Sequence, residues 1–144
     1  MRFLLLLLTF TLTLFAAHID DFALNMGYER EFDKALAQAK KENKVVMLVL
    51  VGDYCPWCRK FERKTLQNAT TAIMIQNNFI AVIVDKNLDK DKYPEKYFTS
   101  VVPTVRFIEP KKDVEMLESS GYKKVKEYEE ILKKVLAQHK GSKS

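Results

Sequence analysis

The residues best suited to chemistry are the only two cysteines of the chain, Cys55 and Cys58, which stand three positions apart. An apolar, β-branched run at residues 45–51 precedes them, and a helical pattern at residues 61–66 follows. A strand that leads through a short loop into a helix would place the Cys55 sulfur at the helix N-terminus. Unpaired N–H groups and the helix dipole stabilise a thiolate there. Pro56 fits the first helical position because its missing N–H has no intrahelical partner.

Three interpretations of the cysteine pair are open. A structural disulfide would close a very small loop, and the stabilisation from a disulfide grows with loop size. Half of a metal site would need further ligands, for which the chain offers only His18 and His139, near its two ends. A redox dithiol needs only the two sulfurs on one helical face, close enough to open and close a disulfide. The position of the pair between a buried strand and a helix favours the redox dithiol.

Three motifs of the chain resemble the thioredoxin superfamily, and within it the periplasmic thioredoxin-related proteins and the C-terminal thioredoxin-like domain of DsbD-type electron carriers. The motifs, together with Phe61-Glu62, are Lys44-Val45-Val46-Met47-Leu48, Asp53-Tyr54-Cys55-Pro56-Trp57-Cys58 and Val102-Pro103-Thr104. The resemblance covers roughly residues 28–138. It implies a thioredoxin-like α/β fold, a thiol–disulfide oxidoreductase activity, and no cofactor beyond the redox-active disulfide.

The two sulfurs are predicted to have different roles. Cys55 is nearest the helix start and, by resemblance, the more exposed, so we expect it to attack a partner disulfide. Cys58 would then attack Cys55 and release the reduced partner. The resemblance also implies a cis bond before Pro103, with Val102 and Pro103 packed against the cysteines. The Val102 backbone would then be free to pair with an extended substrate segment. The alternative is a proline at a strand start with no further role.

The residues beside the cysteines are expected to tune the site. Pro56 and Trp57, between the two sulfurs, are predicted to set the reduction potential. Trp57 is expected to be exposed and to form either a docking surface or a packing contact. Tyr54 occupies the position where thioredoxins usually carry tryptophan, and we expect it to shield the site and to contact substrate.

One position departs from the pattern of the superfamily. Many relatives carry a buried carboxylate six residues before the first cysteine, where this chain has Val49. Glu62 lies seven residues after Cys55, where DsbD-type domains also carry a glutamate. It is therefore our candidate for modulating the pKa of the cysteines. The alternative is a solvated helix residue paired with Arg59 or Lys60.

The first 17 residues are typical of a secretory signal peptide. A charged start, Met1-Arg2, is followed by an apolar stretch and by Ala16-Ala17. Cleavage near Ala17 is predicted, and the alternative is an uncleaved leader that anchors the protein in the inner membrane. Export would place the dithiol in the periplasm, where a partner must keep it reduced or oxidised. We expect protein dithiols and disulfides as substrates and a membrane thiol carrier of DsbD type as electron donor.

The composition is that of one globular domain. The chain has 144 residues, 47% hydrophobic and 30% charged, with a formal net charge of +5. Because the basic residues are spread through the chain, we expect solvated surface rather than a nucleic-acid site. Asp85, Asp89 and Asp91 lack the glycine and glutamate of a calcium loop, so no metal site is predicted.

Hydrophobic patterning predicts alternating helices and strands, and therefore a mixed sheet sandwiched by helices. Residues 18–27 are expected to be an irregular lead-in, residues 28–139 the domain, and residues 140–144 a basic tail. Predicted strands span 45–51, 79–84, 101–108 and 114–117. Predicted helices begin at Tyr28, at the cysteines and near Ala72, with a short one at 93–98 and a closing one from Val125.

The direction of electron flow is not fixed by these motifs. Dithiols of this kind span about −270 to −120 mV, which covers reductants and oxidants. The DsbD-like surroundings favour a reductase that serves cytochrome c maturation or the repair of oxidised proteins. The alternatives are a disulfide oxidase or isomerase, and a non-catalytic binding module of the same fold.

Overall fold

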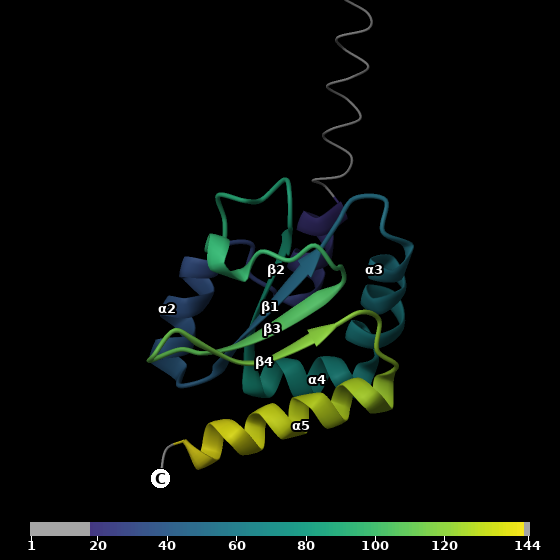
Figure 1. Ribbon diagram of the computed structural model, residues 1–144. Helices are drawn as coiled ribbons and strands as arrows, with labels where there is room; N and C mark the ends of the chain where they lie inside the picture. Colours follow the sequence, from purple (N-terminus) through teal and green to yellow (C-terminus); the bar gives the residue numbers. More distant parts are fainter. Residues whose placement is uncertain (1–17, 143–144) are drawn as a thin grey trace, which may run out of the picture.

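A mixed four-stranded sheet forms the centre of the molecule (Figure 1). The computed structural model describes residues 18–142. Its strands are β1 (Val45–Val51), β2 (Phe79–Asp85), β3 (Thr104–Glu109) and β4 (Val114–Ser120). The spatial order is β2-β1-β3-β4, with β1 parallel to β2, and β3 antiparallel to both β1 and β4. This confirms the predicted α/β class with a mixed central sheet.

Helices cover both faces of the sheet. They are α2 (Phe32–Glu42), α3 (Pro56–Phe61), the π-helical turn η1 (Glu62–Leu66), α4 (Ala69–Asn78), the 3₁₀ turn η2 (Glu95–Tyr97) and α5 (Val125–Gly141). One face packs against α3, α4, α5 and helical residues 18–26, and the other against α2 and the segment around η2. Figure 1 shows α2 on one side of the sheet and α3 on the other. Within residues 18–142, no helix is both long and apolar enough to cross a membrane.

The central strand β1 is buried along its whole length. Side chains alternate between the two faces of a strand, so Met47 and Val49 point into the core under α3 and α5, while Leu48 points into the core under α2. A strand covered on both faces must be apolar at every position, which is why β1 reads as an unbroken hydrophobic run. The predictions for β1 and β2 are confirmed.

The N-terminal lead-in is helical, which corrects the expectation of an irregular segment. Residues 18–26 form a helix, and Ile19, Phe22 and Ala23 are buried against the core. Their spacing of three and four residues places them on one helical face. This apolar stripe has only three residues in a segment of ten, so its periodicity was too short to predict a helix.

The first predicted helix begins later than expected, because residues 28–31 are not helical. Gly27 has φ of +69°, a left-handed conformation that glycine adopts readily and that ends the preceding helix. Glu29 then pairs with the edge of β2: its N–H donates to the Ala81 carbonyl at 2.8 Å, and the Ile83 N–H donates to its carbonyl at 3.0 Å. Tyr28 thus lies outside the helix, directly before the bridge at Glu29, and α2 starts at Phe32.

Smaller differences occur toward the C-terminus. Phe98 is exposed rather than packed, and the short helix is reduced to η2. The third strand begins at Thr104, since Pro103 has no N–H to donate to a ladder. The closing helix α5 includes Lys140, which was expected in a tail. The predicted leader lies outside the described residues.

Candidate active site

The two cysteines lie where β1 passes through a short loop into α3. Cys55 is the N-cap residue of α3, with extended backbone, and its Sγ accepts a hydrogen bond from the Cys58 N–H at 3.1 Å. Pro56 occupies the first helical position, as predicted. The pair is closed as a disulfide, with Cα atoms 5.2 Å apart. Cys55 is half-buried and Cys58 fully buried, so solvent and partners reach the first sulfur only.

The segment before β3 lies against the exposed sulfur. The Val102–Pro103 peptide bond is cis, and the Val102 carbonyl oxygen is 3.9 Å from the Cys55 Sγ. Gly52 permits this approach, because a Cβ there would lie 3.3 Å from the Val102 Cγ2. The Gly121 N–H donates to the Pro103 carbonyl at 2.8 Å and ties the end of β4 to the same place. The fold thus brings residues of three distant segments together around the disulfide.

An open groove runs beside the disulfide. It has a volume of about 370 Å³ and is lined by Trp57, Val102, Pro103, Gly121 and Tyr122. The Trp57 side chain is 57% exposed, in agreement with the expectation, and its ring centroid lies 5.7 Å from that of Tyr122. Sequence reasoning missed Tyr122, because no spacing rule relates it to the cysteines.

Tyr54 directly precedes Cys55 in the chain. Its backbone is left-handed, with φ of +50°, and its side chain is largely exposed. A large aromatic surface next to the accessible sulfur can contact an approaching partner. The adjacent Asp53 is largely exposed as well. Partial desolvation of its carboxyl and the nearby Asp85 carboxylate raise the pKa of Asp53.

Glu62 is a buried carboxylate, only 3% exposed, so the alternative is wrong in making it solvated, although the pairing with Arg59 that it named is present. It lies one turn after Cys58, and its N–H donates to the carbonyls of Cys58 and Arg59. Its Oε1 is 2.8 Å from the Arg59 Nη2, and its Oε2 is 3.1 Å from the His18 Nε2. Burial raises the pKa of Glu62, while Arg59 and His18 act in the opposite direction. Val49, six residues before Cys55, is fully buried.

The carboxylates of the loop after β2 have structural partners. The Asp85 Oδ1 accepts hydrogen bonds from the N–H groups of Asn87 and Leu88, and the Asp89 Oδ2 accepts from the Asp85 N–H and from Arg30. In the part of the chain that the structure describes, no group of three or more His, Cys, Asp or Glu side chains could hold a metal ion.

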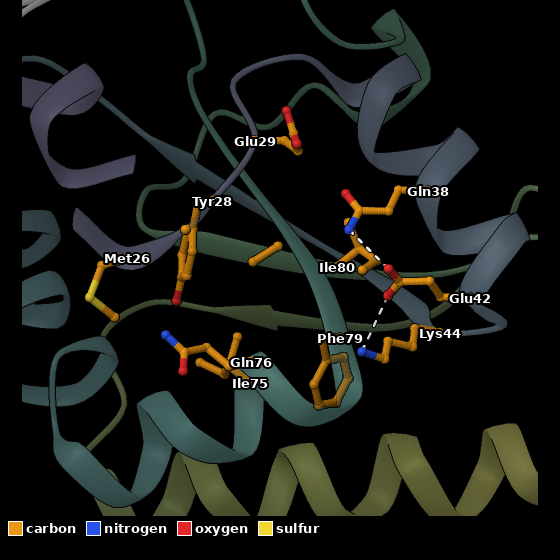
Figure 2. A pocket seen from close by; sticks show the side chains of 12 residues that line it. Met26, Tyr28, Glu29, Gln38, Glu42, Lys44, Ile75, Gln76, Phe79 and Ile80 are labelled. Atoms are coloured by element: carbon orange, nitrogen blue, oxygen red, sulfur yellow. Dashed lines mark hydrogen bonds and ion pairs between the residues drawn. The ribbon is translucent and has the colours of Figure 1, made fainter. Parts of the chain in front are cut away.

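A second hollow, of about 300 Å³, lies at the outer edge of β2 and contains neither cysteine (Figure 2). On its rim Glu42 accepts a hydrogen bond from Gln38 and pairs with Lys44, and these contacts lower the pKa of Glu42. The Tyr28 hydroxyl points toward Gln76 from the inner wall, and burial raises the pKa of Tyr28. None of the residues that line this hollow lines the groove beside the disulfide.

The chain belongs to the Thioredoxin-like family, which residues 28–110 match. It is similar to Spermatogenesis-associated protein 20 of Rattus norvegicus, with 32% identity over 71 residues, which is 49% of this chain and 9% of that protein's length. The fold is shared with a thioredoxin from Thermus thermophilus, at a TM-score of 0.70 and 19% identity over 81% of this chain and 92% of that one. It is also shared with the C-terminal domain of DsbD from Neisseria meningitidis in the oxidised form. The TM-score is 0.59 and the sequence identity is 18%, over 74% of this chain and 97% of that one.

The predicted resemblance to the thioredoxin superfamily is therefore confirmed, as is the thioredoxin-like fold. The chain spans only a small part of the curated relative it matches, so that relative's own role does not transfer. The family, the fold and the disulfide-bonded cysteine pair together support a thiol–disulfide oxidoreductase.

Proposed function

We propose that the protein is a periplasmic thiol–disulfide oxidoreductase that reduces disulfide bonds in other proteins. The observation that carries this proposal is the asymmetry of the pair: an accessible Cys55 Sγ at the start of a helix, and a fully buried Cys58 directly behind it. A thiolate formed at Cys55 would accept a hydrogen bond from the Cys58 N–H, and the positive end of the α3 dipole would stabilise its charge.

The reaction needs both cysteines reduced at the start. The Cys55 thiolate attacks one sulfur of the partner disulfide, an S–S bond forms between the two proteins, and the partner's other sulfur leaves as a thiolate that takes up a proton. The Cys58 thiol loses its proton and attacks the Cys55 Sγ, which closes the intramolecular disulfide and releases the second partner thiol. In total two electrons pass from the protein to its partner. Of the two protons that the partner takes up, one comes from the Cys58 thiol and the other from solvent, into which Cys55 released its proton when it ionised.

The surroundings of Cys55 would position the partner. An extended segment can pair with the Val102 backbone, whose carbonyl is beside the reacting sulfur. Trp57 and Tyr54 flank Cys55 and offer exposed aromatic surface for the partner's side chains. Glu62, one turn beyond Cys58, would act on the buried thiol through its charge state.

The cycle requires an electron donor in the compartment to which the leader sequence points. A membrane thiol carrier of DsbD type would reduce the Cys55–Cys58 disulfide after each turnover, and the reduced protein would then serve cytochrome c maturation or the repair of oxidised proteins. The fold shared with DsbD C-terminal domains and the signal-like residues 1–17 support this part of the proposal.

The test is the reduction of insulin disulfides with dithiothreitol as electron source. We expect the wild-type protein to accelerate the reaction and Cys55→Ser to abolish the acceleration, since the attacking sulfur is gone. Thr70→Ser, an equally small change at an exposed position of α4, should leave the rate unchanged. A folded wild-type protein without activity would indicate a binding module instead, and full activity in Cys55→Ser would contradict the assignment of Cys55 as the attacking sulfur.

A further inference from the structure

A lysine is held over the aromatic side of the active-site groove. The Lys60 Nζ lies 4.9 Å from the ring centroid of Trp57 and 4.9 Å from that of Tyr122. Both rings line the groove beside the disulfide. Two cation–π contacts fix the position of the ammonium group without neutralising its charge. A fixed charge loses less conformational entropy on binding a partner than a freely rotating lysine would.

Lys60 belongs to a basic rim, which we define as Lys60, Lys64, Lys123 and Lys124. The two halves of the rim are joined by a hydrogen bond of 2.6 Å, in which the Thr65 Oγ1 donates to the Lys123 carbonyl. Lys123 is paired with an acid, Glu127, at 3.7 Å. Among the ion pairs within residues 18–142, none involves the other three lysines of the rim.

Two acids lie near the rim, and neither pairs with Lys60, Lys64 or Lys124. Glu62 is buried and already lies against Arg59 and His18. Glu127 is the partner of Lys123. Lys60 therefore places a positive charge over the aromatic wall of the groove. Complementary charge on a partner would both steer its approach and favour the correct partner.

The shape of the groove admits an extended chain. Gly121 forms part of its wall, and a Cβ at this position would meet no atom within 4 Å, so the space beside it is open. At the other wall the Val102 carbonyl lies 3.9 Å from the Cys55 Sγ. A segment that places its sulfur at Cys55 would therefore pass its neighbouring side chains along Trp57 and Tyr122, within reach of Lys60.

From this arrangement we infer that the substrates are proteins whose reactive cysteine is flanked by acidic residues, with an Asp or Glu side chain pairing with Lys60. The inference rests on the proposed function, because it names the substrate class of the same site. The groove adjoins the reacting sulfur, which favours a cysteine-containing polypeptide over a nucleic acid as the acidic partner.

Binding can be measured without any redox chemistry. Trp57 is the only tryptophan of the chain, so the intrinsic fluorescence reports on the groove itself. The disulfide-closed protein is titrated with a short peptide in which glutamates flank a serine in place of the cysteine, and with its glutamine counterpart. We expect the glutamate peptide to bind about fivefold more tightly, the size of one partly exposed ion pair. The difference should shrink between about 0.1 M and about 1 M salt.

Two variants decide whether Lys60 is responsible. Lys60→Met keeps the length and the apolar stem but removes the charge, so it should abolish the preference for the glutamate peptide. Lys111→Met removes an exposed lysine from the turn at the far end of β3, and the preference should remain. A thermal melt establishes that both variants are folded. Equal affinity for the two peptides, or an unchanged preference in Lys60→Met, would overturn the inference, as would equally tight binding of a DNA oligonucleotide.

A kinetic arm separates this inference from the proposed function. The same peptides with cysteine restored, and closed as mixed disulfides with glutathione, are reduced by the protein with dithiothreitol present. We expect a ratio of kcat/KM between glutamate and glutamine peptides of about five in the wild type and about one in Lys60→Met. If neither peptide is reduced while the binding preference is present, the proposed function fails and the acidic docking surface stands.

Discussion

Cys55 and Cys58 differ in accessibility although they belong to one short helix. Cys55 is half-buried at the N-cap, and Cys58 is completely buried one turn on. A second protein can therefore reach Cys55 alone, and a mixed disulfide can only be resolved from behind, by Cys58. This separates an attacking sulfur from a resolving one without any further group.

The first prediction at the residue scale is a trapped intermediate. In Cys58→Ser the Cys55 thiolate can still attack a partner disulfide, but nothing displaces the captured partner. We expect a covalent complex with a disulfide-bonded protein substrate on non-reducing gels, lost on adding dithiothreitol. Cys55→Ser is the matched control and should trap nothing. Equal trapping by both variants would contradict the assigned roles.

Glu62 is the second residue whose environment has a measurable consequence. Burial raises the pKa of Glu62 above its ordinary value of 4.5 despite Arg59 and His18. In the unfolded chain the carboxyl loses its proton at lower pH than in the folded protein. The carboxyl therefore contributes stability that is fully present below pH 4.5 and is lost as the pH rises through the raised, folded-state pKa.

Glu62→Gln should remove this part of the pH dependence. The amide stays neutral, so the free energy of unfolding should fall less between about pH 4 and about pH 8 than in the wild type, by roughly 1.4 kcal/mol for each unit of pKa shift. Urea denaturation at a series of pH values measures this. Glu130→Gln, at an exposed position of α5, should follow the wild-type curve. Parallel curves for Glu62→Gln and the wild type would contradict the direction of the shift.

The sequence predicted Glu62 as a candidate and Arg59 as a possible partner, but not the burial of Glu62 or its contact with His18. Arg59 is three residues away, and this pairing could be anticipated on a helix. His18 is 44 residues away and reaches Glu62 only because residues 18–26 fold back as a helix onto the core. Long-range contacts of this kind leave no periodic signal, and the same holds for Tyr122 in the groove.

At the scale of elements, the turn between β4 and α5 holds one wall of the groove in place. Gly121 has φ of +80°, a left-handed backbone conformation that L-residues with a side chain adopt only with strain. Its N–H donates to the Pro103 carbonyl. A substitution at Gly121 would therefore test backbone strain without steric crowding, because a Cβ at this position would meet no atom within 4 Å.

The same substitution at two glycines should therefore have opposite effects. Gly121→Ala should lower the free energy of unfolding by about 1–2 kcal/mol, because alanine is forced into the left-handed region. Gly141→Ala, at the end of α5 and equally free of contacts, should be neutral or raise it by up to about 1 kcal/mol. Thermal or urea unfolding of the two variants gives the comparison, and two changes of the same sign would refute the explanation.

Strands with an unbroken apolar run were predicted well from the sequence. The start of a helix, where a local change of backbone conformation interrupts the pattern, was not. β1 and β2 are apolar at every position because both faces are covered, and their bounds matched to within a residue. The start of α2 was misplaced because Tyr28 and Phe32 fit a helical spacing, while the left-handed Gly27 and the Glu29 bridge to Val82 interrupt it. A bridge to a strand more than fifty residues away cannot be inferred from local pattern.

At the scale of the whole molecule, the N-terminal helical segment completes the core under α3 and α5. Phe22 is buried, and its ring packs edge-on against Tyr28 with centroids 5.5 Å apart. Leu24, two residues further, is 81% exposed. The segment is thus part of the folded domain and not an appendage.

Truncation at these two positions tests that conclusion. Phe22→Ala should reduce the free energy of unfolding by about 3–5 kcal/mol, because it removes a buried ring and leaves a cavity. Leu24→Ala should change it by less than about 0.5 kcal/mol, as expected for an exposed side chain. Equal and small effects in urea unfolding would show that residues 18–26 do not contribute to the core.

The whole account depends on a disulfide between Cys55 and Cys58 that opens and closes in exchange with other thiols. Equilibration of the protein with glutathione buffers of graded redox state measures this directly, with the fraction of reduced protein read by thiol alkylation. We expect a reversible two-electron transition at a potential nearer to about −270 mV, the value of a reductant, than to about −120 mV. A potential near the upper value would reverse the direction of electron flow. A pair that does not exchange with glutathione at all would contradict the central claim.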